Sequence, residues 1–284
     1  MQSSTQILAG ASHLLAPRDD HFARRATRLE QLATEQPEND WLASLAVLSR
    51  HQQTAFSALS EPPAQSELKA VWQGIYSALF ATMAGSPLAP QGAAPLEGNA
   101  LDAAGEACLQ LARGEIVAGA RGNQDYLVAA AMQVAWSAAA SSPASMDHAH
   151  GGTHKRCPHC GAEPVGGIVL AGEGKAGLRY LECSLCATRW HAVRAHCTLC
   201  DEGSAVSYLG LEGGNATVQA ECCDHCHGYV KTCFQEKDAD VDPVADDLAS
   251  LMLDVLVGQE GYSRASPNLF LAGVEPLEGS APAE

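Results

Sequence analysis

Apolar residues recur at helical spacing through the first half of the chain. Between residues 19 and 36 they fall at positions i, i+4, i+7 and i+11, which is one stripe of an α-helix. Similar patterns predict helices over residues 40–52, 67–84, 102–113 and 124–140. No alternation typical of a strand is found before residue 150. We therefore predict an α-helical bundle for residues 1–142, with the apolar stripes as its core.

Three arginines of the first predicted helix lie away from this stripe or beside it. They are Arg24, Arg25 and Arg28. Charged residues on the polar side of an amphipathic helix normally face water. We therefore expect a solvated helix face here, with a recognition surface as the less favoured interpretation.

The pattern changes after a small, polar, histidine-containing stretch, residues 143–156, which is typical of a linker. Two pairs of short strand-like segments follow, 168–170 with 178–181 and 205–211 with 217–221, each pair joined through glycines. We predict two small β-hairpins, one in each of two tandem units. The units span residues 157–196 and 197–234.

The last part, residues 235–284, is predicted to form a C-terminal helix and a tail. Asp242 is suited to cap the helix, and Pro243 to occupy its first position. Its apolar stripe consists of Val244, Leu248, Leu251, Met252 and Val255. We expect this stripe to pack on the helical domain, with the surface of a second subunit in a homodimer as the alternative.

Composition and charge narrow the possible classes of protein. Of the 284 residues, 46% are hydrophobic, which excludes a wholly disordered chain and allows two domains. Acidic residues outnumber basic ones by 33 to 17, which argues against binding to nucleic-acid phosphates. Two long uncharged stretches are interrupted by proline or consist mostly of alanine and serine, so no membrane span is expected. The first residues lack the features of a signal peptide, and we expect a cytoplasmic protein.

The strongest chemical signal is a set of four CxxC pairs. These are Cys157 with Cys160, Cys183 with Cys186, Cys197 with Cys200, and Cys223 with Cys226. A shift of 40 residues superimposes the first two pairs on the last two, and each half has the form C-x2-C-x22-C-x2-C. This repeat indicates an internal duplication. The spacing is close to that of sites in which four thiolates hold one metal ion.

The eight cysteines therefore predict two rubredoxin-like or zinc-ribbon-like metal knuckles. Four sulfur ligands suit both iron and zinc, so the spacing leaves the metal open. Disulfides are less favoured in a cytoplasmic chain, and a thioredoxin-like redox site would require a different strand–helix context. Cys108, Cys222 and Cys233 lie outside the repeat, and Cys222 adjoins Cys223 as a possible competing ligand.

Several longer stretches resemble the FdhE family of formate dehydrogenase accessory proteins. They are HFARRATRLEQLA (21–33), GLRYLECSLCATRWHAVRAHCTLC (177–200), DHCHGYVKTC (224–233), PVADDLASLMLD (243–254) and EGYSRASPNLFL (260–271). The resemblance covers nearly the whole chain, and its paired cysteines correspond to the eight positions of the repeat.

This resemblance implies a function that the cysteine spacing alone does not. It implies a cytoplasmic accessory protein, without turnover of its own, that acts on the catalytic subunit of respiratory formate dehydrogenase before export. It also implies iron at the two rubredoxin-type sites, with zinc as the alternative. A second hypothesis is a rubredoxin-like electron-transfer or thiol-redox protein that acts on the dehydrogenase. A zinc-ribbon nucleic-acid binder would need a basic face, which the sequence does not offer.

Overall fold

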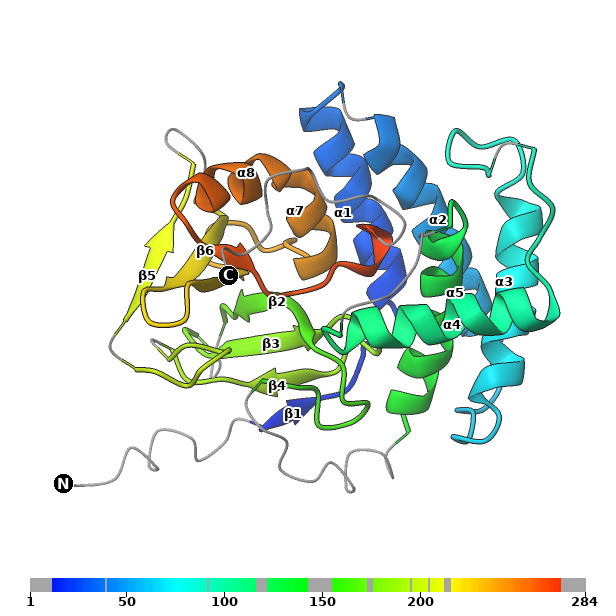
Figure 1. The fold of residues 1–284 in the computed structure, drawn as a ribbon, viewed down its shortest axis with the longest axis horizontal. Coiled ribbons are helices and arrows are strands. Elements are labelled where there is room, and N and C mark those ends of the chain that lie inside the picture. The colour runs from blue at the N-terminus through cyan, green and yellow to red at the C-terminus, as the bar shows by residue number, and fades with distance from the viewer. Residues whose placement is uncertain are drawn as a thin grey trace.

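The computed structural model describes most of the chain. The described residues are 12–38, 40–90, 92–115, 122–142, 155–172, 176–194, 196–203, 205–211 and 216–271. The predicted linker, 143–156, lies outside them except for its last two residues. A group of helices occupies one side of the molecule and a mixed β-sheet the other (Figure 1). The predicted combination of a helical bundle and four-cysteine knuckles is confirmed.

The five helices predicted before residue 142 are all present. They are α1 (His21–Glu35), α2 (Asp40–Ser57), α3 (Leu68–Thr82), α4 (Gly98–Ala112) and α5 (Asp125–Ala140). Helix α5 is central, because α2, α3 and α4 all pack against it and every residue from Leu127 to Ala140 is buried. Its many alanines explain this position, since small side chains let neighbouring helices approach from several sides.

The two cysteine units share one sheet instead of forming separate hairpins. Its strands are β1 (Leu14–Leu15), β2 (Pro164–Val169), β3 (Arg179–Cys183), β4 (Arg189–His191), β5 (Val206–Leu209), β6 (Val218–Cys223), β7 (Gly228–Phe234) and β8 (Ser263–Arg264). The order is β1-β4-β3-β2-β7-β6-β5, with β8 beside β7. Parallel pairing of β2 with β7 joins the units. At this junction Gly167 packs against Thr232, where a Cβ atom would collide with the threonine side chain.

Four of these strands, β1, β4, β7 and β8, were not predicted. In each unit a further strand, β4 or β7, follows the second CxxC pair and completes a three-stranded meander. Strand β1 precedes the helices and pairs with β4, in a region where the sequence shows no alternation typical of a strand. A strand of two residues is too short to show an alternating pattern, and it is recognised as a strand only by its pairing with a distant strand.

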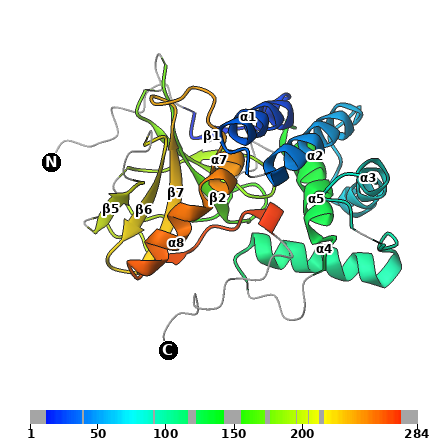
Figure 2. The same ribbon diagram turned by 90° about the horizontal axis from the view of Figure 1, so that it is seen from above.

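The predicted C-terminal helix is divided into two. Helix α7 (Pro243–Ala249) is followed, after Ser250, by α8 (Leu251–Gln259). The predicted cap is confirmed, because a carboxylate oxygen of Asp242 accepts hydrogen bonds from the backbone amides of Val244 at 3.0 Å and Ala245 at 2.8 Å. Helix α7 lies between α1 and the sheet, where it contacts β2 and β7 (Figure 2).

The break divides the predicted apolar stripe. Val244 and Leu248, on α7, are buried in the main core, as expected for packing on the helical domain. Beyond Ser250 the chain turns, and Met252 and Val255 on α8 are 63% and 41% exposed. The alternative of a second subunit on this stripe stays a prediction.

The expected solvated arginine face is wrong for two of its three residues. Arg25 and Arg28 are only 2% and 5% exposed. Helix α7 and the segment before it cover this side of α1 and supply buried carboxylates, so that Arg28 binds Asp246 at 2.7 Å. Arg24 alone remains partly in water, with a side chain that is 46% exposed. The partners come from more than 200 residues away, which local sequence patterning does not reveal.

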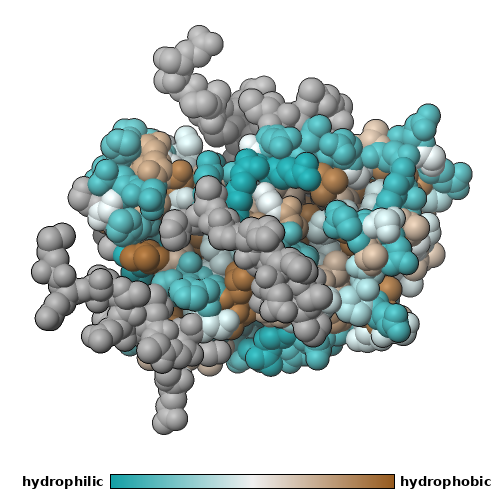
Figure 3. Space-filling model, turned by 90° about the horizontal axis from the view of Figure 1, so that it is seen from below, coloured by the Kyte–Doolittle hydropathy of each residue, from teal (hydrophilic) through white to brown (hydrophobic). Residues whose placement is uncertain are grey.

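Over the part of the chain that is described, no helix has the length and apolar character needed to cross a membrane. The face seen from below is mostly hydrophilic where it is not covered by grey atoms, and hydrophobic side chains show only in small groups (Figure 3).

Candidate metal centres

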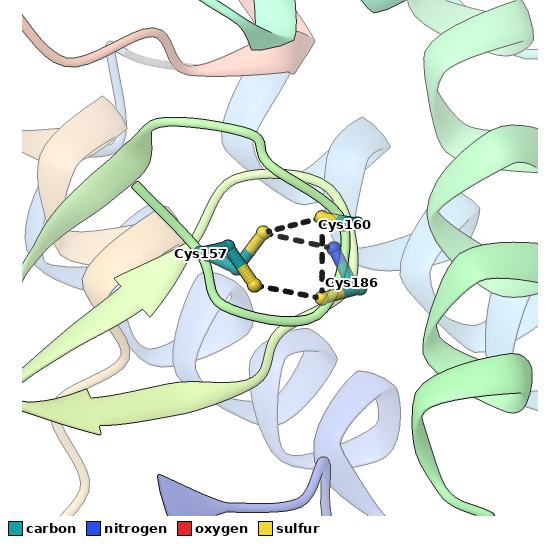
Figure 4. Close-up of side chains that lie close together, drawn as sticks. Cys157, Cys160 and Cys186 are labelled. Carbon is teal, nitrogen blue, oxygen red and sulfur yellow. Dashed lines mark hydrogen bonds between the residues drawn. The ribbon is translucent and has the colours of Figure 1, made fainter. Parts of the chain in front are cut away.

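The first group of cysteines lies where helix α5 meets the sheet. Cys157 and Cys160 come from the turn before β2. Cys183 ends β3, and Cys186 lies in the turn between β3 and β4. Their sulfurs lie within 4.8 Å of one another, and the labelled side chains in Figure 4 point toward a common centre. The sulfur–sulfur distances are 3.5 Å for Cys157–Cys186, 3.4 Å for Cys160–Cys183 and 3.5 Å for Cys160–Cys186.

The second group repeats this arrangement at the other end of the sheet. Cys197 and Cys200 lie before β5. Cys223 ends β6, and Cys226 lies in the turn between β6 and β7. These sulfurs are also within 4.8 Å of one another, with Cys197–Cys226 and Cys200–Cys223 both at 3.7 Å. The structure therefore brings together all eight cysteines of the sequence repeat, in the two predicted groups of four.

All four CxxC turns have the same backbone conformation. The residue after each second cysteine has a positive φ, between 53° and 76°, and these residues are Gly161, Ala187, Asp201 and His227. Each donates its amide to the carbonyl of the first cysteine, at 2.9 to 3.3 Å. Only the first of these residues is glycine, so the other three adopt a backbone conformation that is uncommon for residues with a side chain. This tight turn aims both sulfurs of a pair to the same side.

Backbone amides also point at the sulfurs. The amides of Leu185 and Cys186 both donate to Cys183 Sγ at 3.4 Å, and the amide of Leu199 donates to Cys197 Sγ at 3.3 Å. Such hydrogen bonds stabilise negative charge on sulfur. The turns are therefore suited to thiolates, the form of cysteine that binds metal.

The sulfur spacing fits a metal ion in each group. Four sulfurs at about 2.3 Å from a tetrahedral ion lie about 3.8 Å apart, close to the observed 3.4 to 3.7 Å. A disulfide would require about 2.05 Å, and all eight cysteines are free thiols. The donor set suits iron and zinc equally, because both accept a tetrahedron of four sulfurs.

The electrostatics of the first group favour a bound cation. The pKa of Cys157 lies well below its usual value, because the other three thiols hydrogen-bond to its sulfur. Burial raises the pKa of Cys183 and Cys186 well above the usual value, and it raises that of Cys197 in the second group to about 12. Four thiolates together therefore need a positive ion, whose binding releases protons.

The three cysteines outside the repeat lie away from both groups. Cys222 neighbours Cys223 on β6, but successive side chains of a strand point to opposite faces. It packs under α8 with Ala220 and Tyr229, and burial raises its pKa to about 12. Cys233 is buried in a second small core and Cys108 in the main core. The structure thus gives Cys222 no place in the second group.

A polar hollow that the sequence did not indicate separates the first knuckle from α1. Its lining includes Arg18, His21, Arg24, Glu182 and Arg189. His21 Nδ1 lies 2.6 Å from the carbonyl oxygen of Arg18, which can only accept, so Nδ1 carries the proton. Burial lowers the pKa of His21 to about 3, and its Nε2 atom is a buried acceptor without a partner among the described residues. A single histidine beside an apolar stripe carries no sequence signal for such a site.

The fold and these sites define a class of protein in which a helical bundle is fused to a duplicated four-cysteine unit. Two family models match consecutive parts of the chain: "FdhE, central domain" over residues 156–194 and "FdhE, C-terminal domain" over residues 195–271. Together they include both groups of cysteines.

Full-length comparisons extend this match to the helical part. A "Protein FdhE homolog" of Pseudomonas aeruginosa is 38% identical over 302 residues, covering 94% of this chain and 96% of the relative. The "Protein FdhE" of Escherichia coli K12 is 33% identical over 282 residues, covering 91% and 90%. The crystal structure of the FdhE protein from Pseudomonas aeruginosa superimposes with a TM-score of 0.73 at 31% identity, covering 91% of this chain and 98% of that one. The chain belongs to the FdhE family.

Proposed function

We propose that this chain is an accessory protein for the maturation of respiratory formate dehydrogenase and has no turnover of its own. In this role it binds the catalytic subunit of the dehydrogenase in the cytoplasm, as a chaperone binds its client. The observation that carries the proposal is the match to FdhE proteins along 94% of the chain, which includes both four-cysteine groups. A fold by itself is not sufficient evidence for a function, but these groups of thiols form a site with defined chemistry.

Each of the two groups of four cysteines would hold one metal ion, and we assign iron to both sites. Sulfur distances of 3.4 to 3.7 Å support a tetrahedral ion, and zinc is the alternative. Anaerobic purification followed by metal analysis distinguishes the two metals. Two equivalents of iron per chain is the expected result, and two equivalents of zinc would replace iron in the proposal.

The polar hollow beside α1 is the part of the surface that we assign to the client. It lies between the helical bundle and the first knuckle, with contributions from β3, α1 and the segment before α7. Its lining includes the imidazole of His21, and its rim carries Arg24, whose ion pair with Asp240 is 4.0 Å long. An exposed charge without a close partner is available to a bound polypeptide.

Affinity capture tests both the client and its position. Tagged protein is purified anaerobically from cells that express formate dehydrogenase, and the catalytic subunit is quantified by immunoblot. Arg24→Glu reverses a charge at the rim, and the matched control Arg50→Glu reverses an equally exposed arginine on α2. We expect capture by the native protein and the control, and roughly tenfold less by Arg24→Glu, since a rim contact contributes about 1.4 kcal/mol.

The two parts of this proposal fail separately. If the metal-loaded native protein captures no catalytic subunit, the accessory role is wrong. If Arg24→Glu captures as much as the control, the role stands but the hollow is not the client surface.

Rubredoxin-like electron transfer is the second candidate, and one observation favours it. Cys226 is exposed, so a redox partner could approach a ligand sulfur of the second site directly. Iron held by four sulfurs carries one electron reversibly, whereas zinc has no redox chemistry. A zinc-filled protein that fully restores dehydrogenase maturation would exclude this candidate, and a reversible one-electron signal is required for it.

A further inference from the structure

The two four-cysteine groups differ in burial although their geometry is the same. The repeat places Cys186 and Cys226 at equivalent positions, the last ligand of each unit. Cys186 is 0% exposed, whereas Cys226 is exposed to solvent. In the first group three cysteines are buried and one is intermediate; in the second, two are buried, one is intermediate and one is exposed. The pair of equivalent sulfurs therefore offers a comparison within one molecule.

The residues inside the CxxC turns explain this difference. The first unit has Ser184 and Leu185 between its last two cysteines, and the second unit has Asp224 and His225. Leu185 is 2% exposed and belongs to the main core, whereas both residues of the second turn are exposed. An apolar side chain draws the first turn into the core, and charged or polar ones keep the second turn in water.

Helix α5 holds the first turn in place. The side-chain amide of Gln133 on α5 donates to the backbone carbonyl of Ser184 at 2.9 Å. The Ser184 hydroxyl donates to the backbone carbonyl of Glu163 at 2.8 Å. The hydroxyl of Thr188, which is fully buried, lies 3.2 Å from Cys186 Sγ. Access to this sulfur therefore requires the helical bundle to separate from the sheet.

Around its exposed end, the second turn makes side-chain contacts at the surface. The hydroxyl of Tyr262 donates to Asp224 at 2.5 Å, and the ring of His227 lies beside that of Tyr262. Cys226 is exposed and Cys200 is partly exposed. A small molecule can therefore reach the second group from solvent without opening the core.

We propose that the two sites have different tasks: the first is a permanent structural site, and the second exchanges its metal with external thiols through Cys226. This inference rests on the part of the proposed function that places a metal in each site. In the exchange, Cys226 Sγ gives up its bond to the metal and takes a proton, while an incoming thiol loses its proton and its sulfur bonds in the same place. One metal–sulfur bond breaks and one forms, and no electrons are transferred.

The test measures both sites in the same protein. The full chain is loaded with two equivalents of zinc, which has no redox chemistry, and mixed with a chromogenic zinc chelator. We expect zinc release in two phases of equal amplitude. The rate constant of the slow phase should be smaller than that of the fast phase by about 100-fold or more, because the buried site opens only through separation of packed elements. Millimolar glutathione should accelerate the fast phase and leave the slow one unchanged.

Alkylation assigns the phases to residues without any substitution. Iodoacetamide is added during metal release, and the modified peptides are quantified by mass spectrometry. Cys226 should be modified together with the fast phase, and its equivalent Cys186 only with the slow phase. Equal alkylation rates at these two residues, or a single phase of release, would overturn the proposal.

A variant and its matched counterpart complete the design. Cys226→Ser should abolish the fast phase and keep one slow equivalent of zinc, with an unchanged circular dichroism spectrum. Cys186→Ser removes a core ligand and should lower the thermal midpoint of the whole chain. If the native chain loads only one equivalent of zinc, both the metal assignment and this proposal are contradicted. Capture of the catalytic subunit is measured in a separate experiment. If the protein captures no catalytic subunit but releases zinc in two phases, only the accessory role is contradicted.

Discussion

Replacement of Arg28 tests whether a buried ion pair holds the C-terminal segment on the helical bundle. The guanidinium of Arg28 is 6% exposed and binds Asp246 through hydrogen bonds of 2.7 to 3.2 Å. It also reaches Asp238 at 2.8 Å. These contacts join α1 to residues more than 200 positions away along the chain. In Arg28→Met, the hydrocarbon part is retained and the charge is lost.

The expected cost follows from the carboxylate that remains. Asp246 is 3% exposed, and removal of one partner from a buried pair costs about 3–5 kcal/mol, since the other charge is left uncompensated. The control Arg50→Met breaks a pair with Glu30 whose side chains are about half exposed, and such pairs contribute about 0–1 kcal/mol. Arg28→Met with Asp246→Asn should recover most of the loss, because the amide is neutral and its oxygen can still accept from the amide of Asp242.

Urea unfolding of the metal-loaded protein, followed by circular dichroism, measures these differences. With a slope of about 2–3 kcal/mol per molar urea, the single variant should unfold about 1–2 M earlier than the native protein. Burial raises the pKa of Asp246 and Arg28 opposes this rise, so loss of Arg28 raises it further. The folded state then binds a proton more readily than the unfolded one, and the deficit should shrink as the pH falls. A loss no greater than that of Arg50→Met would refute the reasoning.

Two further predictions concern the core and the pH dependence of stability. Leu127→Ala truncates a fully buried side chain on the central helix and should cost about 2–5 kcal/mol in urea unfolding, whereas Val47→Ala, at a residue 44% exposed, should cost under about 0.5 kcal/mol. An equal cost would show that α5 is not the centre of the core. Burial lowers the pKa of His21 to about 3, so below about pH 6.5 the unfolded state binds more protons and stability falls as the pH falls. Between pH 6.5 and 5 this residue should account for about 2 kcal/mol of the lost stability. The variant His21→Asn, whose amide can still donate to the carbonyl of Arg18, should lack that part of the loss. Parallel curves of unfolding free energy against pH for the two proteins would contradict the burial of a neutral imidazole.

Local chemistry made part of this structure predictable from the sequence. The five helices before residue 142 follow from apolar periodicity, and the cap at Asp242 follows from a carboxylate placed before a proline and an apolar stripe. The two groups of four sulfurs follow from the repeated CxxC spacing, since each tight turn aims two sulfurs to one side. Each of these features depends on residues that are near neighbours in the chain or on a spacing repeated within it.

Long-range packing decided the rest. The burial of Arg25 and Arg28 depends on a segment more than 200 residues away, and the single sheet depends on the pairing of β2 with β7 across the two units. The sequence by itself determined that two equivalent groups of four cysteines exist. Only the tertiary structure decided that they are unequal, because contact with α5 removes water from one group, whereas the last cysteine of the other, Cys226, is exposed.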